Sequence, residues 1–544
     1  MRAADLLVKC LEKEKVKYVF GLPGEEVLSV LDALSYSNIQ FIPTRHEQGA
    51  AFMANVVGRL TGKAGVCLAT LGPGATNLMT GVADALLDYS PLVAITGQTD
   101  LSKSHKQAHQ YIDIREMFHP ITKWNSKITR PEAIPEIMRW AFKVAEVEKP
   151  GSTHLELSED VAASTVEGEP LEPTPVAYPE PNKNSVLEAA RLIEKSNYPI
   201  MIAGHGVIRR KAHAELTALA QKVHIAVTNT FMGKGCVDYN KPYSLPTVGM
   251  HQRDWIMCGL ERADLIITVG YDQIEYEPCL WNPDKNKKII HIDTLPSSVD
   301  EHYMPQVEIV GEIGHSLDAL AEACQFTKNY AGLSALREFI LGELDQYKND
   351  SGCPVKPQKI LADLRSVLGK NDILISDVGA HKVWIARMYP ARVPNSVIIS
   401  NGFASMGFAL PGAIAAKLVY PERRVVVVCG DGGFLMNSQE LETAKRLGVA
   451  FVVVIWVDNS YGLIEWKQMN MFKKHFGVRF DNPDFVTLAR AYGLPGFKIK
   501  DANDFIPTLR QALDFKVPSI IEVPIDYSEN LRLTEKLGHL VCPI

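Results

Sequence analysis

The chain has 544 residues, of which 46% are hydrophobic and 22% are charged, and its formal net charge is −6. At roughly 100 to 200 residues per domain, this length predicts about three domains. The charge is only mildly acidic and Lys and Arg form no long run, which argues against a nucleic-acid partner. No stretch of about eighteen apolar residues occurs, so we expect no membrane-spanning segment.

The first residues and the cysteines indicate a cytoplasmic protein. The sequence begins directly with an amphipathic, charged helical pattern, which is unlike a secretory signal. Nine cysteines are scattered between Cys10 and Cys542 without a C-x-x-C pair. We therefore expect reduced thiols in a cytoplasmic protein rather than disulfides or a zinc site.

The first block of the chain, residues 1–165, alternates helical patterns with short apolar runs. The runs have the length and composition of buried strands and lie at residues 18–20, 65–69, 92–95 and 154–157. This alternation predicts a parallel sheet covered by helices. Prolines at positions 170, 173, 175, 179 and 181 then predict an extended linker.

The second and third blocks, residues 185–325 and 354–544, repeat this plan. In the second block, apolar runs that indicate strands lie at residues 199–203, 226–228, 265–269 and 288–292. In the third block they lie at residues 373–377, 424–429 and 451–457. The sequence thus predicts an α/β protein of three doubly wound, parallel-sheet domains. The first and third blocks share the alternating plan without a visible repeat of residue identity.

Two strands of the third block end in oxygen-bearing side chains. The run at 424–429 leads directly to Gly430-Asp431-Gly432-Gly433, and the run at 451–457 ends in Asp458-Asn459. Because parallel strands end at the same edge of a sheet, Asp431 and Asn459 are expected to meet in a glycine-lined crevice. One carboxylate and one amide oxygen suit Mg²⁺ bound with a diphosphate, and the main-chain carbonyl of Tyr461 is a third candidate ligand. A lone Gly-Asp-Gly is equally typical of a tight turn.

The Gly-Asp-Gly segment, followed by Asn459 after about twenty-five residues, resembles the thiamine diphosphate (ThDP) motif. Further segments match, in order, the acetolactate synthase branch of the ThDP-dependent enzymes. They are residues 21–25 (GLPGE), 45–51 (RHEQGAA), 71–77 (LGPGATN), 109–110 (HQ), 118–124 (FHPITKW) and 405–411 (SMGFALP). The resemblance therefore runs essentially from end to end of the chain.

The resemblance implies three α/β domains: an N-terminal pyrimidine-binding, a central, and a C-terminal diphosphate-binding domain. It implies one ThDP, with Mg²⁺, between the N-terminal domain of one subunit and the C-terminal domain of its partner. A homodimer would be the minimum unit, often paired into a homotetramer. The implied cofactor-binding residues are Pro23, Gly24, Gly72, Asn77, Val378, Gly379, His381, Ala404, Met406, Gly430, Asp431, Gly432, Gly433, Asn459, Tyr461, Gly462 and Leu463.

Three residues receive reaction roles from the same resemblance, each beside an ordinary structural reading. Glu47 matches the glutamate that hydrogen-bonds N1′ of the aminopyrimidine; by itself it could equally cap a turn or pair with Arg45. Met406 matches the apolar wedge that bends the cofactor, or else is a core methionine. Gln110, beside His109, would reach the substrate, or else lies on a plain surface turn.

The central block favours the catabolic, FAD-independent subtype. The segment at residues 271–278 (YDQIEYEP) lacks the Arg-Phe-Asp-Asp-Arg type segment of the FAD-containing biosynthetic enzymes, so FAD is unexpected. Residues 158–160 (SED) replace their Pro-Lys-Asp. Lys467 does not fit the catabolic pattern. At this position catabolic enzymes tend to carry glutamine and biosynthetic ones tryptophan. Lys467 is expected to touch the acceptor substrate.

The implied reaction is decarboxylation of pyruvate and joining of its two-carbon unit to a second 2-oxo acid. With pyruvate as acceptor, the product is 2-acetolactate. The alternative is another ThDP-dependent 2-oxo acid decarboxylase or carboligase. A non-catalytic relative would be expected to have lost Glu47, Asp431 or Asn459, all of which are present. A plain dinucleotide-binding protein is disfavoured because no G-x-G-x-x-G follows a strand with the expected acidic residue.

Overall fold

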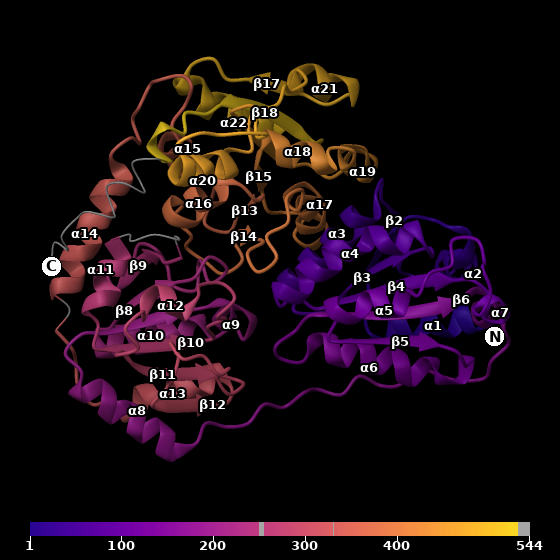
Figure 1. Ribbon diagram of the computed structural model, residues 1–544, viewed down its shortest axis with the longest axis horizontal. Coiled ribbons are helices and arrows are strands. Elements are labelled where there is room, and N and C mark those ends of the chain that lie inside the picture. The colour runs from indigo at the N-terminus through magenta and orange to yellow at the C-terminus, as the bar shows by residue number, and fades with distance from the viewer. Residues whose placement is uncertain (250–254, 330, 531–544) are drawn as a thin grey trace.

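The computed structural model describes residues 1–249, 255–329 and 331–530, and it contains three lobes, each built on one six-stranded sheet (Figure 1). The strand pairs of all three sheets are parallel, and helices flank each sheet. The predicted fold class, three doubly wound α/β units, is therefore confirmed.

The first sheet has the order β2-β1-β3-β4-β6-β5. Its strands are β1 (Tyr18–Gly21), β2 (Gln40–Pro43), β3 (Gly65–Ala69), β4 (Leu92–Gln98), β5 (Trp124–Ile128) and β6 (Ser152–Ser158). Its helices are α1 (Ala3–Lys13), α2 (Leu28–Ser35), α3 (Glu47–Thr61), α4 (Pro73–Leu87), α5 (Ile114–Phe118), α6 (Ile134–Glu146) and α7 (Glu159–Ala163). Residues 166–182 then form no regular element and run to the second lobe as an extended connection (Figure 1).

The second sheet has the order β12-β11-β10-β7-β8-β9. Its strands are β7 (Pro199–Ala203), β8 (Ala226–Asn229), β9 (Ser244–Thr247), β10 (Leu265–Val269), β11 (Lys288–Asp293) and β12 (Val307–Val310). Its helices are α8 (Lys183–Lys195), α9 (His205–Arg209), α10 (His213–Val223), α11 (Trp255–Arg262), α12 (Pro278–Trp281) and α13 (Ile313–Ala323). Helix α14 (Ala331–Asp345) leads toward the third lobe.

The third sheet has the order β14-β13-β15-β16-β18-β17. Its strands are β13 (Ile373–Ser376), β14 (Val397–Ile399), β15 (Val425–Gly430), β16 (Val452–Val457), β17 (Gly496–Lys498) and β18 (Ser519–Pro524). Its helices are α15 (Pro357–Val367), α16 (Ala380–Met388), α17 (Ala409–Val419), α18 (Asp431–Asn437), α19 (Glu440–Leu447), α20 (Gly462–Phe472), α21 (Phe485–Ala491) and α22 (Phe505–Asp514).

The strand orders relate the first lobe to the third and set the second apart. When strands are numbered within each lobe, the first and third sheets both run 2-1-3-4-6-5. The second sheet runs 3-2-1-4-5-6, which is the order of dinucleotide-binding domains. The shared plan that the sequence suggested for the first and third blocks is thus present as identical topology.

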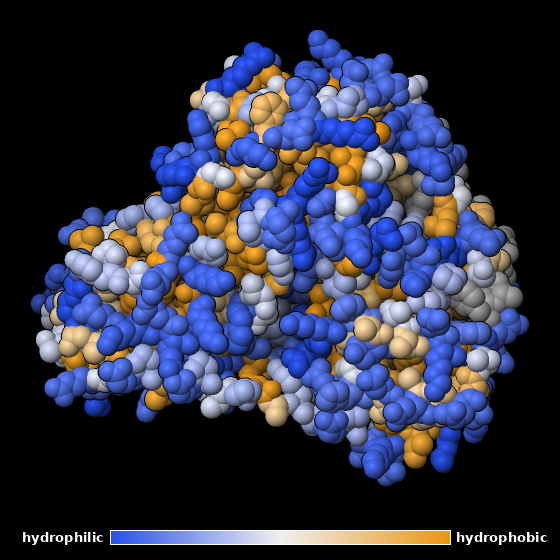
Figure 2. All heavy atoms as spheres, turned by 180° about the vertical axis from the view of Figure 1, so that it is seen from behind, coloured by the Kyte–Doolittle hydropathy of each residue, from blue (hydrophilic) through white to orange (hydrophobic). Residues whose placement is uncertain are grey.

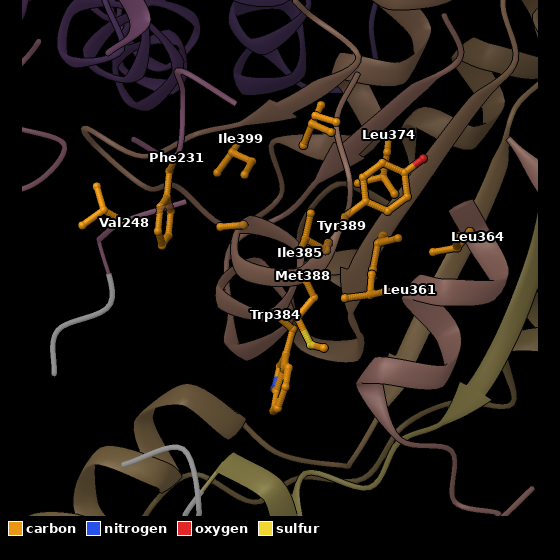
Figure 3. Packing of buried hydrophobic residues seen from close by; sticks show 14 of the residues in the cluster. Phe231, Val248, Leu361, Leu364, Leu374, Trp384, Ile385, Met388, Tyr389 and Ile399 are labelled. Atoms are coloured by element: carbon orange, nitrogen blue, oxygen red, sulfur yellow. The ribbon is translucent and has the colours of Figure 1, made fainter. Parts of the chain in front are cut away.

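The third domain packs against both of the others through the two faces of its central strand. In β15, even-numbered side chains join a hydrophobic cluster shared with the second domain, and odd-numbered ones join a cluster shared with the first. Figure 3 shows part of the former cluster, which includes Phe231 and Val248 of the second domain as well as Trp384 and Ile385 of α16. The edge of the sheet that carries Asp431 is therefore held between two cores.

A buried lysine also joins the second domain to the third. The ammonium nitrogen of Lys234 donates to Thr247 Oγ1 at 3.1 Å and to the Ala386 carbonyl in α16 at 2.7 Å. Burial lowers the pKa of Lys234 to about 7. The folded protein therefore binds fewer protons than the unfolded chain between about pH 7 and 10.4, so folding stability rises with pH through this window.

We expect Lys234→Met to raise the melting temperature relative to wild type by more at pH 7 than at pH 10, because the variant has no ammonium group to discharge. The gap in unfolding free energy between Lys234→Met and wild type should change by about 3 kcal/mol between pH 7 and pH 10. Thermal unfolding of both proteins at both pH values measures it, with exposed Lys241→Met as control. A difference between Lys234→Met and wild type that is independent of pH would contradict the expectation.

Two expectations from composition have different outcomes. Among the described residues, no helix is long and apolar enough to cross a membrane. Of the eight cysteines that the structure describes, Cys10, Cys67, Cys236, Cys279, Cys324, Cys353 and Cys429 are free, but Cys258 in α11 is disulfide-bonded. The prediction of reduced thiols throughout is therefore wrong at Cys258, because spacing along the chain does not reveal which cysteines the fold brings together.

Candidate active site

Asp431 and Asn459 meet at the carboxyl edge of the third sheet, as their positions predict. Asp431 follows β15 directly and is the first residue of α18, and Asn459 lies two residues beyond the neighbouring strand β16. Asp431 Oδ2 accepts the Asn459 N–H at 2.8 Å, and Oδ1 accepts the Gly432 N–H at 2.8 Å. Burial raises the pKa of the Asp431 carboxyl, and these hydrogen bonds offset part of that effect.

The arrangement of acceptor oxygens fits a small cation. Asn482 Nδ2 donates to Asp431 Oδ2 at 2.7 Å and to Asn459 Oδ1 at 2.8 Å, so the two oxygens face one small space, which the Asn482 amide nitrogen occupies in this structure. Hard oxygen ligands around such a space suit Mg²⁺. Asn482 was not identified from the sequence, because it lies in a loop far along the chain with no motif around it.

Tyr461 has a different local role from the one predicted for its carbonyl. It caps the start of α20, and its main-chain carbonyl accepts the N–H groups of Ile464 at 2.9 Å and Glu465 at 3.0 Å. The structure therefore uses this carbonyl within the helix, and its part as a metal ligand stays a prediction.

A cavity of about 180 Å³ opens beside Asp431. Twelve of the residues assigned to the cofactor line it: Val378, Gly379, His381, Ala404, Met406, Gly430, Asp431, Gly432, Gly433, Tyr461, Gly462 and Leu463. Helices α16 and α20 begin at its wall, and N–H groups at a helix start bind anions well. A Cβ on Gly432 would lie 2.9 Å from the Tyr461 ring, so close packing requires glycine there. These features fit a diphosphate.

Asp377 holds the loop that carries Met406. Its Oδ1 accepts the N–H groups of Val378 at 2.7 Å and Gly407 at 2.9 Å, and its Oδ2 accepts that of Ala409 at 3.1 Å. Burial raises the pKa of Asp377 to about 6, and the three bonds act in the opposite direction. Asp377 thus fixes two sides of the cavity, although the sequence marked it only as the end of a strand.

Glu47 is the first residue of α3 and is buried, with 5% of its surface exposed. The helix begins there because the His46 side chain caps it by accepting the Gln48 N–H at 3.1 Å. Asn77 Nδ2 donates to Glu47 Oε2 at 2.9 Å, while a Cβ on Gly74 would lie 3.4 Å from Oε1. The readings of Glu47 as a cap on a solvated turn or as a partner of Arg45 do not describe this buried site.

The other first-domain candidates gather near Glu47 at the carboxyl ends of β1 and β3. Pro23 and Gly24 follow β1, and a Cβ on Gly24 would lie 2.3 Å from Thr70, directly after β3. A Cβ on Gly72 would lie 2.8 Å from the Gln110 carbonyl. The segment with His109 and Gln110 is exposed, and Lys467 is exposed on α20.

The two groups of site residues belong to different domains and do not share the cavity. All described residues that line it come from the third domain. The start of α3 instead lies against the far end of α18, where Asn437 Nδ2 donates to Gln48 Oε1 at 3.2 Å. Within one chain, the predicted first-domain residues around Glu47 and the third-domain residues around the cavity therefore form two separate groups.

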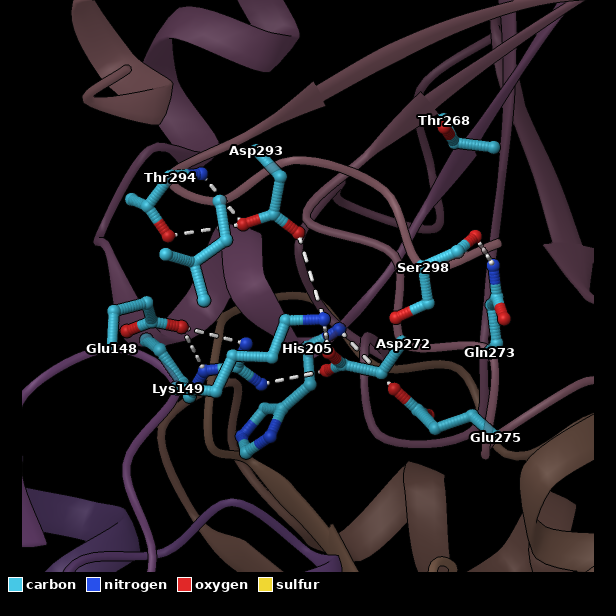
Figure 4. Close-up of polar contacts among 12 residues, drawn as sticks. Glu148, Lys149, His205, Thr268, Asp272, Gln273, Glu275, Asp293, Thr294 and Ser298 are labelled. Atoms are coloured by element: carbon cyan, nitrogen blue, oxygen red, sulfur yellow. Dashed lines mark hydrogen bonds and ion pairs between the residues drawn. The ribbon is translucent and has the colours of Figure 1, made fainter. Parts of the chain in front are cut away.

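Ion pairs fill the corresponding edge of the second sheet (Figure 4). Asp272 lies 2.7 Å from Arg209 and 2.8 Å from Lys149, and Arg209 also pairs with Glu148 at 2.7 Å. Burial alone would raise the pKa of Asp272, but the two cations hold it well below its usual range. Glu148 and Lys149 belong to the first domain and reach across to this edge of the second sheet. In dinucleotide-binding domains with the same strand order, this edge holds the dinucleotide.

Comparison with known proteins agrees with this geometry. Residues 1–117 match the thiamine pyrophosphate enzyme N-terminal TPP binding domain, 186–320 the central domain, and 377–523 the C-terminal TPP binding domain. The chain is 37% identical to "Acetolactate synthase, catabolic" of Raoultella terrigena, over 98% of this chain and 97% of that one. It is 33% identical to "Acetolactate synthase" of Bacillus subtilis (98% and 94%) and 36% identical to "Probable acetolactate synthase large subunit" of Methanocaldococcus jannaschii (99% and 94%).

The three domains and their sites define a thiamine diphosphate-dependent enzyme. Within that class, similarity over nearly the whole chain shows that it belongs to the acetolactate synthase family. The resemblance drawn from the sequence is confirmed, and so is thiamine diphosphate as cofactor.

Proposed function

We propose that this protein is an acetolactate synthase, which decarboxylates pyruvate and joins its two-carbon unit to a second 2-oxo acid. The observation that carries the proposal is that relatives named for this activity match the chain from end to end. Glu47 and Asp431 are buried, and Asn459 is exposed but its N–H is held by the Asp431 carboxylate; the presence of all three supports an active enzyme.

The side chains divide the work between binding and proton transfer. Thiamine diphosphate, when bound, supplies the electron sink for decarboxylation that no side chain offers. Asp431 and Asn459 would hold Mg²⁺ at the diphosphate, because their oxygens lie close enough together to share one partner, now the Asn482 amide nitrogen. Glu47 would hold a proton for the pyrimidine, with Asn77 fixing its orientation. Met406, at the wall of the cavity, would support the bent cofactor.

We further infer that the working unit is a homodimer, or a pair of such dimers, with each active site formed between two subunits. The separation of the Glu47 group from the cavity within one chain supports this arrangement. Figure 2 shows hydrophobic side chains gathered over the third domain and its junction with the first. Exposed apolar residues of the third domain include Phe403, Leu435, Met436, Ile464 and Phe472. A partner subunit would bury such a surface.

Two further proposals concern the catabolic, FAD-independent subtype and the acceptor substrate. The ion pairs around Asp272 support an enzyme without FAD, because they fill the edge that a dinucleotide would need. The exposed position of Lys467 on α20 supports contact with the acceptor acid. We also propose domain limits of 1–165, 185–325 and 354–544, which place the extended residues 166–182 in the first linker.

Product analysis tests the proposal directly. Incubation with pyruvate, Mg²⁺ and thiamine diphosphate is expected to yield acetolactate, detected as acetoin after acid treatment. A second reaction with pyruvate and 2-oxobutyrate reports how far the site near Lys467 admits the larger acceptor. Acetaldehyde as the only product from pyruvate would overturn the synthase and support the alternative, a 2-oxo acid decarboxylase.

A further inference from the structure

Glu440 is a fully buried carboxylate outside the residues discussed so far. It is the first residue of α19 in the third domain and has 0% of its surface exposed. Thr443 Oγ1 donates to its Oε2 at 2.6 Å. Burial raises the pKa of Glu440, and the hydrogen bonds that it accepts offset only part of that rise.

The other oxygen of Glu440 crosses to the first domain. Glu440 Oε1 accepts the backbone N–H of Arg45 at 3.0 Å and that of His46 at 3.0 Å. These are the two residues immediately before Glu47. Glu440 therefore fixes the backbone that enters α3, and its negative charge lies at the N-terminal end of that helix, where the helix dipole favours an anion.

The first turn of α3 is shaped around this carboxylate. A Cβ on Gly49 would lie 2.9 Å from Glu440 Oε1 and 3.0 Å from Cδ, so the close approach depends on glycine. Asn437, three residues before Glu440, adds a hydrogen bond to the Gln48 side chain in the same turn of α3. The start of α3 is thus held both by its own capping residue, His46, and by the carboxylate of Glu440 from the third domain.

We propose that Glu440 is a positioning residue for Glu47: by holding the N–H groups of Arg45 and His46, it sets the direction in which the Glu47 carboxylate leaves the helix. The inference rests on the proposed role of Glu47 in catalysis. Its structural part, the restraint on residues 45–48, stands independently of which product the enzyme forms.

Three variants separate positioning from general stability. Glu440→Ala removes the acceptor, and we expect kcat for pyruvate consumption to fall by about 10- to 100-fold, with a smaller change in KM. Glu440→Gln keeps an acceptor oxygen and is expected to stay within about 3-fold of wild type. Glu442→Gln, on the exposed side of α19 and paired with Arg446, is the control without effect.

Two further measurements distinguish a role through Glu47 from a merely structural one. Hydrogen exchange of the amides at residues 45–48 should be faster in Glu440→Ala and unchanged in Glu440→Gln. In a Glu47→Gln background, adding Glu440→Ala should cost less than about 3-fold, because the group that it positions is already disabled. If Glu440→Ala does not fold, Glu440→Asp, whose carboxylate is withdrawn by one methylene, is expected to show the same pattern.

Wild-type kcat and amide exchange in Glu440→Ala would overturn the proposal, and so would a full additive loss in the Glu47→Gln background. Pyruvate consumption and amide exchange do not depend on product identity. A failure of the synthase proposal, seen as acetaldehyde alone, is therefore distinguishable from a failure of this one.

Discussion

Glu47→Gln is expected to lower turnover of pyruvate by at least about 100-fold, because positioned proton transfer contributes roughly 10²- to 10⁴-fold. Glutamine keeps the shape of the side chain and can still accept the bond from Asn77, so the fold should be retained. It cannot hold and release a proton. Initial rates of pyruvate consumption at saturating Mg²⁺ and thiamine diphosphate measure the loss.

The matched control for Glu47→Gln is Glu132→Gln, an exposed carboxylate in the same domain, which should leave turnover unchanged. Thermal unfolding of Glu47→Gln should match wild type within a few degrees. Turnover close to wild type in a folded Glu47→Gln protein would refute the assigned role and leave Asn77 and its neighbours as a structural cluster.

The sequence predicted the inner strands of the sheets and not their edges. Apolar runs marked nearly every inner strand, with β18 as the exception, because both faces of such strands are covered and β-branched residues follow one another. The edge strands are β2, β5, β9, β12, β14 and β17. They are short and several carry polar residues, as in Trp124–Ile128 (WNSKI), so no run distinguishes them.

The site shows the same division between motif and tertiary contact. Glu47, Asp431 and Asn459 were predicted as site residues because they stand in recognisable segments at strand ends, and their roles stay predictions. Asp377, Glu440 and Asn482 were missed because their partners are backbone N–H groups or side chains from distant segments. An acidic residue that serves the main chain of another segment has no local signature. Only the fold shows which donors surround it.

Asp431→Ala is expected to lower turnover by at least about 100-fold, because it removes the charged oxygen of the proposed metal site. Binding of Mn²⁺, followed by electron paramagnetic resonance in the presence of thiamine diphosphate, should weaken in parallel. Glu132→Gln again serves as control. Wild-type Mn²⁺ affinity in Asp431→Ala would contradict the metal assignment.

Hybrid dimers made from two inactive variants test how the halves of the site combine. In a dimer of one Glu47→Gln chain and one Asp431→Ala chain, a site shared between subunits leaves one of two sites with both residues intact. Such a hybrid, isolated through two different affinity tags, is expected to recover about half of wild-type turnover. If each site were complete within one chain, both sites would carry a defect and the hybrid would stay inactive.

The reciprocal hybrid gives the opposite pattern and removes the remaining ambiguity. A wild-type chain is paired with a chain that carries both Glu47→Gln and Asp431→Ala. A shared site then places one defect in each active centre, and turnover is expected to fall by at least about 100-fold. A site within one chain would retain about half of the activity. Only the cross-subunit arrangement, in which the Glu47 group of one chain serves the cavity of the other, yields an active first hybrid and an inactive second one.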